Sequence, residues 1–462
     1  MPAPSAQKHD TAVKNNSIPC ALVVSALMGL GHMRAAYALR DLAGGQIVLD
    51  GLAEHSTSSE RLCWQALRAF YYFLSRACEF RVVGPVFQMI LYRLQHIPHL
   101  YPQRDQSRPT MAVRFLDHLI RKEILFTAIL DAVRSTSVPV INSFYASAIA
   151  VDTVCRGTRN NYLLICDADI NRIWVPRDPR TSSIMYLAPC TRAKRRLMAY
   201  GVPATRIHLT GFPLPIENIG SREHMEILKH DLLHRLARLD PAGSFSSMHT
   251  PLVRRYLGSL SEESDMPSTV PLTLTFAVGG AGAHCAMVGT ILASVKDAVA
   301  DGRLRLYLSA GIDADTRDSF LNYICSEGLQ EHLDKGVHVI FHENMHEYLR
   351  RFNEVMRITD VLWTKPSELS FYCALGIPII TAPSVGTHEA INERWLNDVH
   401  AGIEPAGPVE YTHEWLFEVR DNGQLAAAAW DGFLKGRKLG AYKIHDIIST
   451  GVFIAGVTPL ER

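Results

Sequence analysis

The sequence predicts an α/β protein built from two doubly wound, mostly parallel sheets, each covered by helices. Three observations lead to this class. The chain has 462 residues, more than a single hydrophobic core usually organises. Short apolar runs alternate with longer helix-like segments in both halves, as in repeated βα units. A polar stretch with a Ser-rich end, residues 216–270, separates the halves.

Residues 18–215 are expected to form the first domain. The apolar run 18–25 suits a buried strand, 29–32 suits a loop, and 33–42 has helical spacing. Further elements follow in alternation. The expected strands are 46–50, 138–142, 162–166, 184–187 and 207–210, and the expected helices are 145–154 and 191–200, with several more between 60 and 134.

Residues 271–425 are expected to repeat this plan as a second domain. Its first strand, Gly-rich loop and helix fall at 271–277, 279–283 and 285–300. Ligands of such sheets bind at the carboxyl ends of the strands, so we expect a cleft where the two domains face each other. The other segments are strands at 304–308, 337–341, 361–363 and 377–380, a helix at 389–397, a polar tail at 1–17, a linker or insertion at 216–270 and a C-terminal helical segment at 426–462.

Composition and charge exclude several classes of protein. Apolar residues make up 47% and charged residues 20%, and the net charge of +1 offers no overall field for nucleic acid. The nine cysteines are scattered and form no CxxC, which disfavours a disulfide framework and a zinc site. The start of the sequence lacks a signal-peptide pattern and no long apolar run follows. We therefore expect a cytoplasmic protein, with association to a membrane left open.

A Gly-rich turn opens the second domain. Gly279, Gly280 and Gly282 follow an expected strand and precede an expected helix. Glycines let the backbone approach a ligand closely, and the first turn of a helix presents N–H groups that suit a phosphate or diphosphate. A purely structural turn explains the same residues about equally well.

The stretch 360–402 carries a more specific pattern. It contains a strand, a short turn at 365–368, a helix that ends in Gly376-Ile-Pro378, a strand that ends before Pro383, and then a polar pair and an Asn. The polar residues are His388, Glu389 and Asn392. This pattern resembles the nucleotide-sugar-binding half of GT-B glycosyltransferases, most closely the branch that holds MurG and the monogalactosyldiacylglycerol synthases.

The first half resembles the same family. Residues 25–36 look like the family's first strand, Gly loop and helix, with His32 at the end of the loop. Residues 167–174, 190–201 and 211–215 resemble the end of the acceptor domain in members that modify lipids. The fold that the resemblance implies is GT-B, in which two Rossmann-like domains face each other across a cleft.

The resemblance implies an activity and a set of residues. The activity is transfer of a sugar from a nucleotide sugar, a UDP-sugar, to an acceptor hydroxyl, with inversion and without a metal or another cofactor. A nucleotide-sugar 2-epimerase of the same fold and a non-catalytic sugar-nucleotide-binding protein remain as alternatives. The residues expected to bind the donor are Gly279, Gly280, Gly282, Ser367, Glu368, His388, Glu389 and Asn392.

One departure from the family pattern concerns the donor ribose. The family commonly holds the ribose with a carboxylate five residues before the Gly of Gly-x-Pro, and Phe371 occupies that position here. Glu368, one helical turn earlier, is the candidate substitute. Glu389 and Asn392 are three residues apart at a helix start, so they share one face and suit hydrogen bonds to sugar hydroxyls. Capping and solvation are their structural alternative.

His32, Asp167 and Asp169 are the candidate catalytic residues. An imidazole with a pKa near neutrality suits a general base for an acceptor hydroxyl, although a His bonded to backbone at a helix start is an equal alternative. Asp167 and Asp169 look like a DxD metal pair, but that motif belongs to the other glycosyltransferase architecture, so no metal is expected. One of them is expected to orient His32 or bind acceptor, or to pair structurally with Arg172.

Residues 61–134 combine positive charge with aromatic residues. They hold eleven Lys and Arg against five Asp and Glu, an excess of six, while the whole chain has a net charge of +1. Nine aromatic residues fall within 61–101. Such a mixture suits contact with a membrane surface or a lipid-linked acceptor, and ordinary helix packing explains it as well.

Overall fold

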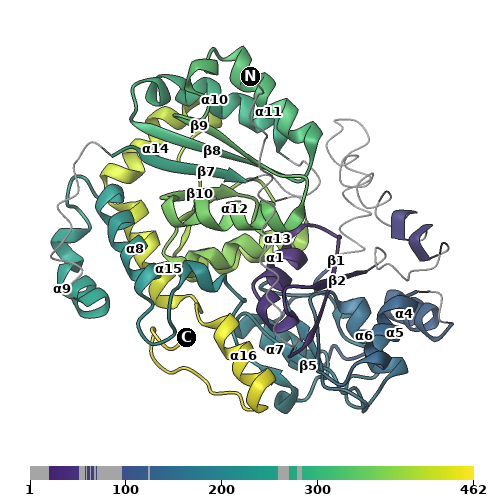
Figure 1. Ribbon diagram of the computed structural model, residues 1–462. Helices are drawn as coiled ribbons and strands as arrows, with labels where there is room; N and C mark the ends of the chain where they lie inside the picture. The colour runs from purple at the N-terminus through teal and green to yellow at the C-terminus, as the bar shows by residue number, and fades with distance from the viewer. Residues whose placement is uncertain are drawn as a thin grey trace, which may run out of the picture.

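The computed structural model describes residues 20–50, 58, 60–62, 64–66, 69, 96–122, 125–258, 270–277, 284–384 and 386–462. Six parallel strands form the first sheet, in the order β2-β1-β3-β4-β5-β6 (Figure 1). In this register Val24 pairs with Val48 on one side and with Asn142 on the other. The strands are β1 (Leu22–Ala26), β2 (Ile47–Asp50), β3 (Val140–Asn142), β4 (Asn161–Leu164), β5 (Met185–Leu187) and β6 (Ile207–His208).

Helices cover this sheet, and its strand residues are almost all buried or half-buried, as expected of parallel strands with helices on both faces. The helices of this part of the chain are α1 (Leu30–Tyr37), α4 (Met111–Arg121), α5 (Thr127–Ser135), α6 (Tyr145–Val154) and α7 (Thr191–Ala199), with short 3-10 helices η1 (Arg40–Ala43), η2 (Arg172–Trp174), η3 (Ala204–Arg206) and η4 (Ile216–Asn218).

The second sheet also has six parallel strands, in the order β12-β11-β10-β7-β8-β9. This is the doubly wound order, in which the first and fourth strands of the domain, β7 and β10, lie side by side at the centre of the sheet. The strands are β7 (Leu272–Ala277), β8 (Leu304–Gly311), β9 (Val337–Phe341), β10 (Val361–Thr364), β11 (Ile379–Thr381) and β12 (Gly402–Ile403).

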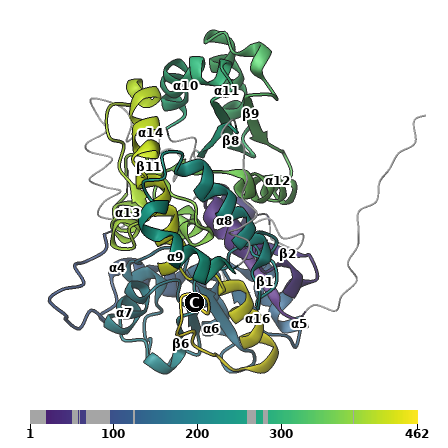
Figure 2. The ribbon, with the colours of Figure 1, turned by 90° about the vertical axis from the view of Figure 1, so that its left-hand side faces the viewer.

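The helices around the second sheet alternate with its strands. They are α10 (Cys285–Ala300), α11 (Ala314–Ser326), α12 (Met345–Ile358), α13 (Thr387–Asp398) and α14 (Thr412–Asp421), with the 3-10 helices η6 (Gln330–His332), η7 (Glu368–Leu375) and η8 (Val409–Tyr411). Figure 2 shows the second domain stacked on the first. Two Rossmann-like parallel sheets in two facing domains confirm the α/β class and the GT-B arrangement that the sequence predicts.

The stretch predicted as a linker or insertion contains two helices, α8 (Glu226–Leu239) and α9 (Ser246–Leu257). Helix α8 packs against α12 and against α15 (Gln424–Lys435). Its Arg235 is fully buried and donates to the carbonyl oxygens of Thr359 and Leu375. Helix α8 is therefore an integral part of the second domain's packing.

The end of the chain returns to the first domain. Helix α16 (Gly440–Thr450) begins in direct contact with the backbone of Phe212 in the first domain. The contact requires glycine at position 440, because a Cβ there would collide with the carbonyl oxygen of Phe212. Arg222 pairs with Asp446 of α16 at 2.6 Å. The predicted C-terminal segment, 426–462, thus holds most of α15 and all of α16, and α16 lies on the first domain. Within the described ranges, none of the helices has both the length and the apolar character that a membrane crossing requires.

Candidate functional site at the domain interface

His32 lies in the first turn of α1, directly after β1 and its loop. The loop turns at Gly29, whose φ of 111° is unfavourable for residues with a side chain. His32 Nδ1 is 2.6 Å from the carbonyl oxygen of Ser143, which can only accept a hydrogen bond. Nδ1 therefore carries the proton and Nε2 keeps its lone pair. Nε2 has no hydrogen-bond partner among the described residues.

The surroundings of His32 lower its pKa. Burial is the largest cause, and it is opposed by the bond to the Ser143 carbonyl and by the negative charges of Asp167 and Glu368. The ring also packs against the aromatic rings of Phe144 and Trp174, at centroid distances of 5.3 and 6.0 Å. The imidazole is thus predominantly neutral at neutral pH, which is the form that accepts a proton.

Asp167 contacts Asn392 of the second domain. Asn392 Nδ2 donates to Asp167 Oδ1 at 2.9 Å, and Asn392 Oδ1 accepts from the backbone N–H of Ala168 at 2.8 Å. Asn392 is fully buried on α13, and Asp167 follows β4. The structure therefore uses the side chain of Asn392, expected at a donor sugar, to join the two domains.

Glu368 makes a second contact between the domains. Its Oε1 is 2.7 Å from Nη1 of Arg34 on α1, and both side chains are buried. Arg34 Nη2 also donates to the hydroxyl of Tyr348 at 2.8 Å. Oε2 of Glu368 lies against Gly31, where a Cβ would come within 2.7 Å of it. The carboxylate considered as a ribose ligand is thus paired with an arginine of the first domain.

Phe371, at the position of the family's ribose carboxylate, is buried. Its ring stacks on Phe212 at a centroid distance of 5.3 Å and packs on Trp395 at 4.8 Å. At this position the chain therefore has an apolar ring packed in the core in place of a carboxylate.

Asp169 is held by arginines other than the expected one. Its carboxylate pairs with Arg196 at 2.7 Å and with Arg192 at 2.9 Å, and it is fully buried. The expected partner, Arg172, instead donates to the carbonyl oxygens of Ser107 and Val175. The prediction that one of the two aspartates pairs with Arg172 is therefore wrong for Asp169, which pairs with Arg192 and Arg196 instead.

Glu389 lies at the start of α13, beside the end of β10. Its Oε1 accepts from Lys365 Nζ at 2.7 Å, and its Oε2 accepts from the backbone N–H of Gly386, as in a capping box. His388 Nε2 is 3.9 Å from the same carboxylate. Ser367 is half-buried at the start of η7. Of the expected donor-binding residues, Ser367 thus lies at the carboxyl end of β10, and His388 and Glu389 lie beside it at the start of α13.

The three loop glycines lie outside the described residues. Gly279, Gly280 and Gly282 follow β7, whose last residue, Ala277, pairs in parallel register with Thr364 of β10. The ends of β7 and β10 are therefore neighbours at the edge where Lys365 and Ser367 stand. In the part of the chain that the structure describes, no three His, Cys, Asp or Glu side chains are arranged to hold a metal.

Sequence reasoning missed Arg34 and Tyr348. Arg34 is a charged residue in an otherwise apolar helix, Leu-Gly-His-Met-Arg-Ala-Ala-Tyr, which is a usable signal of a buried partner. Tyr348 offers no such signal, because a Tyr on an amphipathic helix usually packs in the core. Its hydroxyl is 2.9 Å from Ser309 Oγ, so a polar chain runs from Arg34 into the second sheet.

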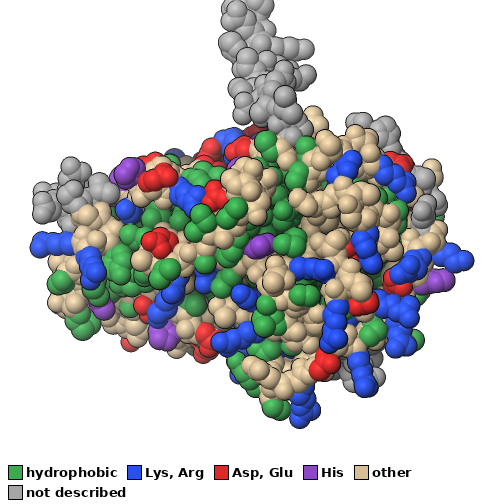
Figure 3. All heavy atoms as spheres, turned by 90° about the horizontal axis from the view of Figure 1, so that it is seen from below, with side chains coloured by type: hydrophobic (Ala, Val, Ile, Leu, Met, Phe, Trp, Pro, Cys, Tyr) green, Lys and Arg blue, Asp and Glu red, His purple; other side chains and the backbone are tan. Residues whose placement is uncertain are grey.

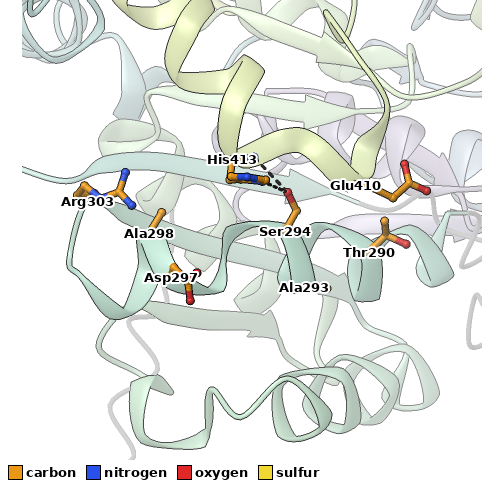
Figure 4. A pocket seen from close by; sticks show the side chains of 8 residues that line it. All are labelled: Thr290, Ala293, Ser294, Asp297, Ala298, Arg303, Glu410 and His413. Atoms are coloured by element: carbon orange, nitrogen blue, oxygen red, sulfur yellow. Dashed lines mark hydrogen bonds between the residues drawn. The ribbon is translucent and has the colours of Figure 1, made fainter.

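A separate pocket of about 400 Å³ lies between α10 and the start of α14 (Figure 4). Ser294 Oγ is 3.1 Å from His413 Nδ1 and also accepts from the backbone N–H of His413. Arg303 on its wall precedes β8, so the pocket reaches the amino ends of the strands. It is therefore distinct from the interface that holds His32.

A family described as "Domain of unknown function (DUF6938)" matches residues 321–443. No curated protein matches the chain. Each of the following similarities is one of fold, at low sequence identity. The solved structures include S. aureus MnaA with UDP (9% identity, 93% of this chain and 95% of that one, TM-score 0.46), the Neisseria meningitidis UDP-GlcNAc 2-epimerase bound to UDP-GlcNAc (10%, 93% and 99%, 0.45) and Acinetobacter baumannii MurG (12%, 93% and 98%, 0.40).

Proposed function

We propose that the chain is an inverting glycosyltransferase that moves a sugar from a UDP-sugar to an acceptor hydroxyl. The observation that carries the proposal is the placement of His32 at the carboxyl end of β1, next to the second domain. Its Nδ1 proton is fixed by Ser143, its Nε2 lone pair has no described partner, and its lowered pKa keeps it neutral. A general base needs these three properties.

The proposed reaction is a single displacement. The acceptor oxygen bonds to the anomeric carbon, the bond from that carbon to the diphosphate oxygen breaks, and the acceptor proton passes to His32 Nε2. Asp167 and Glu368 stabilise the imidazolium that forms, because both carboxylates favour the protonated ring. Inversion follows from attack on the face opposite the leaving group.

The donor is proposed to lie on the second domain. Gly279, Gly280 and Gly282 would bind the diphosphate through backbone N–H groups, which stabilise the leaving charge without a metal. Glu389, His388 and Ser367 are proposed contacts of the sugar and nucleotide, because they share the edge at the end of β10. Glu368 and Asn392 are proposed to serve the site by holding the two domains together around it.

The acceptor is proposed to be a lipid or lipid-linked molecule, in line with the resemblance to the MurG and monogalactosyldiacylglycerol synthase branch. Helix α4 supports a peripheral membrane contact, because Met111 and Phe115 are 79% and 64% exposed on one face beside the exposed Arg114. Figure 3 shows Lys and Arg side chains spread over the lower face of the molecule. Of the nine aromatic residues counted above, Trp64 packs on Phe126, Tyr101 is exposed, and the other seven lie outside the described residues.

Turnover of the donor tests the function. Purified protein is incubated with UDP-sugars, with and without lipid acceptors, and products are identified by NMR. A glycosylated acceptor with inverted anomeric configuration supports the proposal. Conversion of the donor to its 2-epimer without acceptor would establish the epimerase instead, and donor binding without any turnover would establish a binding protein.

The His32→Gln variant tests the base. Gln lacks a titrating nitrogen, so turnover should fall by about 10²–10⁴-fold while the thermal shift caused by UDP stays unchanged. His230→Gln is the matched control, because His230 is exposed on α8. Wild-type turnover in His32→Gln would remove His32 from the mechanism.

Co-sedimentation with vesicles tests the membrane contact. Met111→Ser combined with Phe115→Ser should reduce binding to anionic vesicles at least several-fold, and raised salt should reduce wild-type binding. Met248→Ser on α9 is the control, because Met248 is 72% exposed elsewhere. Wild-type protein that stays in the supernatant with anionic vesicles at low salt would reject the membrane contact.

A further inference from the structure

A pocket of about 350 Å³ lies across the seam between the two domains. One wall comes from the first domain, where β5 leads through Pro189 into the start of α7. The opposite wall comes from Trp395 and Asp398 on α13. The remaining lining residues are Leu100, Tyr101, Cys190, Thr191, Arg192, Arg195, Val399, Lys435, Arg437 and Arg462.

The pocket concentrates positive charge. Five of its thirteen lining side chains are Lys or Arg, against the single carboxylate of Asp398. Arg192 and Lys435 are neutralised by Asp169 and Asp431, at 2.9 and 3.0 Å.

Arg195, Arg437 and Arg462 have no Asp or Glu side chain within 4 Å among the described residues. Arg195 is exposed and donates to the hydroxyl of Tyr101 at 2.9 Å. Arg462 Nε is buried without a hydrogen-bond partner. Burial lowers the pKa of Arg437, and the adjacent Arg462 lowers it further. Arg437 and Arg462 are half-buried near each other, so their charges are costly unless an anion binds between them.

The geometry favours a phosphate. Guanidinium groups bind phosphate oxygens through two parallel N–H groups, and several arginines can share one phosphate. The positive end of the α7 dipole lies at the same wall and adds to the attraction. A volume of about 350 Å³ is sufficient for a phosphate with a small organic group attached.

The pocket adjoins a contact that joins the domains. Cys190 on its wall donates from Sγ to the carbonyl oxygen of Ala168 at 3.3 Å. The N–H of the same Ala168 donates to Asn392 Oδ1. Trp395 of the pocket follows Asn392 by three residues on α13, so the two side chains lie on the same side of the helix. Arg437 lies against Gly211 of the first domain, and the cation that α15 of the second domain contributes to the pocket is Lys435. An anion held by α7 on one side and by Lys435 on the other would therefore reinforce the contact between the domains.

We propose that this pocket is a binding site for a phosphate group, and that its occupation stabilises the joined arrangement of the two domains. The site is separate from the proposed donor site, whose residues follow β7 and β10. The phosphate comes either from a phosphorylated acceptor or from a second, effector-like phosphorylated molecule. Both present the same chemistry to the arginines.

Thermal shift with inorganic pyrophosphate tests the site on the full chain. At constant ionic strength, pyrophosphate should raise the melting temperature saturably, and saturating UDP should leave that rise in place. In the double variant Arg195→Gln, Arg437→Gln the apparent affinity for pyrophosphate should fall at least tenfold. The control is Arg254→Gln, Arg255→Gln, which removes the same charge from exposed positions of α9.

Two results would overturn the proposal. One is the absence of a saturable shift in the wild-type protein, and the other is an equal shift in the pocket variant and the control. Should the double variant fold poorly, Arg437→Gln alone replaces it. Neither result depends on turnover, so failure of this site is distinguishable from failure of the proposed transferase activity.

Kinetics distinguish the two sources of the phosphate once binding is established. If the acceptor supplies it, Arg437→Gln should raise KM for a phosphorylated acceptor and leave KM for the donor unchanged. If an effector supplies it, pyrophosphate should change the turnover of wild-type protein and have no effect on the variant.

Discussion

His32 is the residue on which the proposed chemistry depends, and its surroundings determine its protonation state. The Ser143 carbonyl sets the tautomer, and burial lowers the pKa against the pull of Asp167 and Glu368. The protonated ring cannot act as a base, so activity is lost as pH falls through this pKa. We expect kcat/KM to rise with pH to a plateau whose apparent pKa lies below the ordinary histidine value. An apparent pKa above that value would contradict the assignment.

The buried carboxyl group of Asp50 should make the stability of the folded protein depend on pH. It is buried at the end of β2, and burial, followed by the nearby Glu60, raises its pKa well above the ordinary value. A carboxyl group whose pKa is raised on folding contributes stability that is complete below its unfolded pKa and is lost as pH rises through the folded one. Asp50→Asn cannot ionise, so it should be more stable than wild type by about 1–3 kcal/mol at pH 8 and nearly equal at pH 4.

Chemical unfolding at the two pH values measures this difference. The control is Asp41→Asn, because Asp41 is exposed and its substitution should change stability by less than about 0.5 kcal/mol at either pH. A stability gain of Asp50→Asn that is the same at both pH values would show that ionisation of Asp50 is not its cause.

At the scale of elements, the regular alternation of apolar strand segments with helical segments made the two sheets predictable. The expected helix 389–397 is α13, Thr387–Asp398, and the expected strand 337–341 is β9, Val337–Phe341. Tertiary contacts were not predictable in the same way. Arg34 and Glu368 are 334 positions apart, and no local pattern relates two residues at that distance. The position of His32 after a strand and a loop, at a helix start, could be predicted because that pattern is local.

Helix α8 illustrates the same limit, and it carries a prediction. A polar sequence suggested a linker, but Arg235 is fully buried and its guanidinium donates to five backbone carbonyl oxygens. Burial lowers its pKa to about 10, so it stays charged at neutral pH. Arg235→Met leaves those carbonyls without donors and should lower the free energy of unfolding by about 3–5 kcal/mol.

Urea denaturation measures the effect, with Arg254→Met as the control. Arg254 is exposed on α9, so its substitution should change the free energy of unfolding by no more than about 0.5 kcal/mol. Equal effects of the two substitutions would mean that α8 is only loosely attached to the second domain.

At the scale of the whole molecule, polar contacts of Arg34 and Asn392 join the domains. Arg34 of α1 pairs with Glu368, and Asn392 of α13 bonds to Asp167 and Ala168. Both contacts lie around His32, whose pKa is influenced by Asp167 and Glu368. The groups that hold the domains together therefore also define the electrostatics of the candidate base, so domain position and base strength should change together.

Asn392→Asp tests this coupling. The new carboxylate faces Asp167 at the distance where the amide donated, 2.9 Å, so attraction becomes repulsion between a buried and a half-buried carboxylate. We expect the domains to separate, with a larger radius of gyration in small-angle X-ray scattering and a melting temperature several degrees lower. The control is Asn397→Asp, an exposed position on the same helix, which should leave both quantities unchanged. The separation should also be smaller at low pH, because protonation of either carboxylate restores a hydrogen bond. A scattering profile of Asn392→Asp identical to that of the wild type at neutral pH would show that this contact does not hold the domains together.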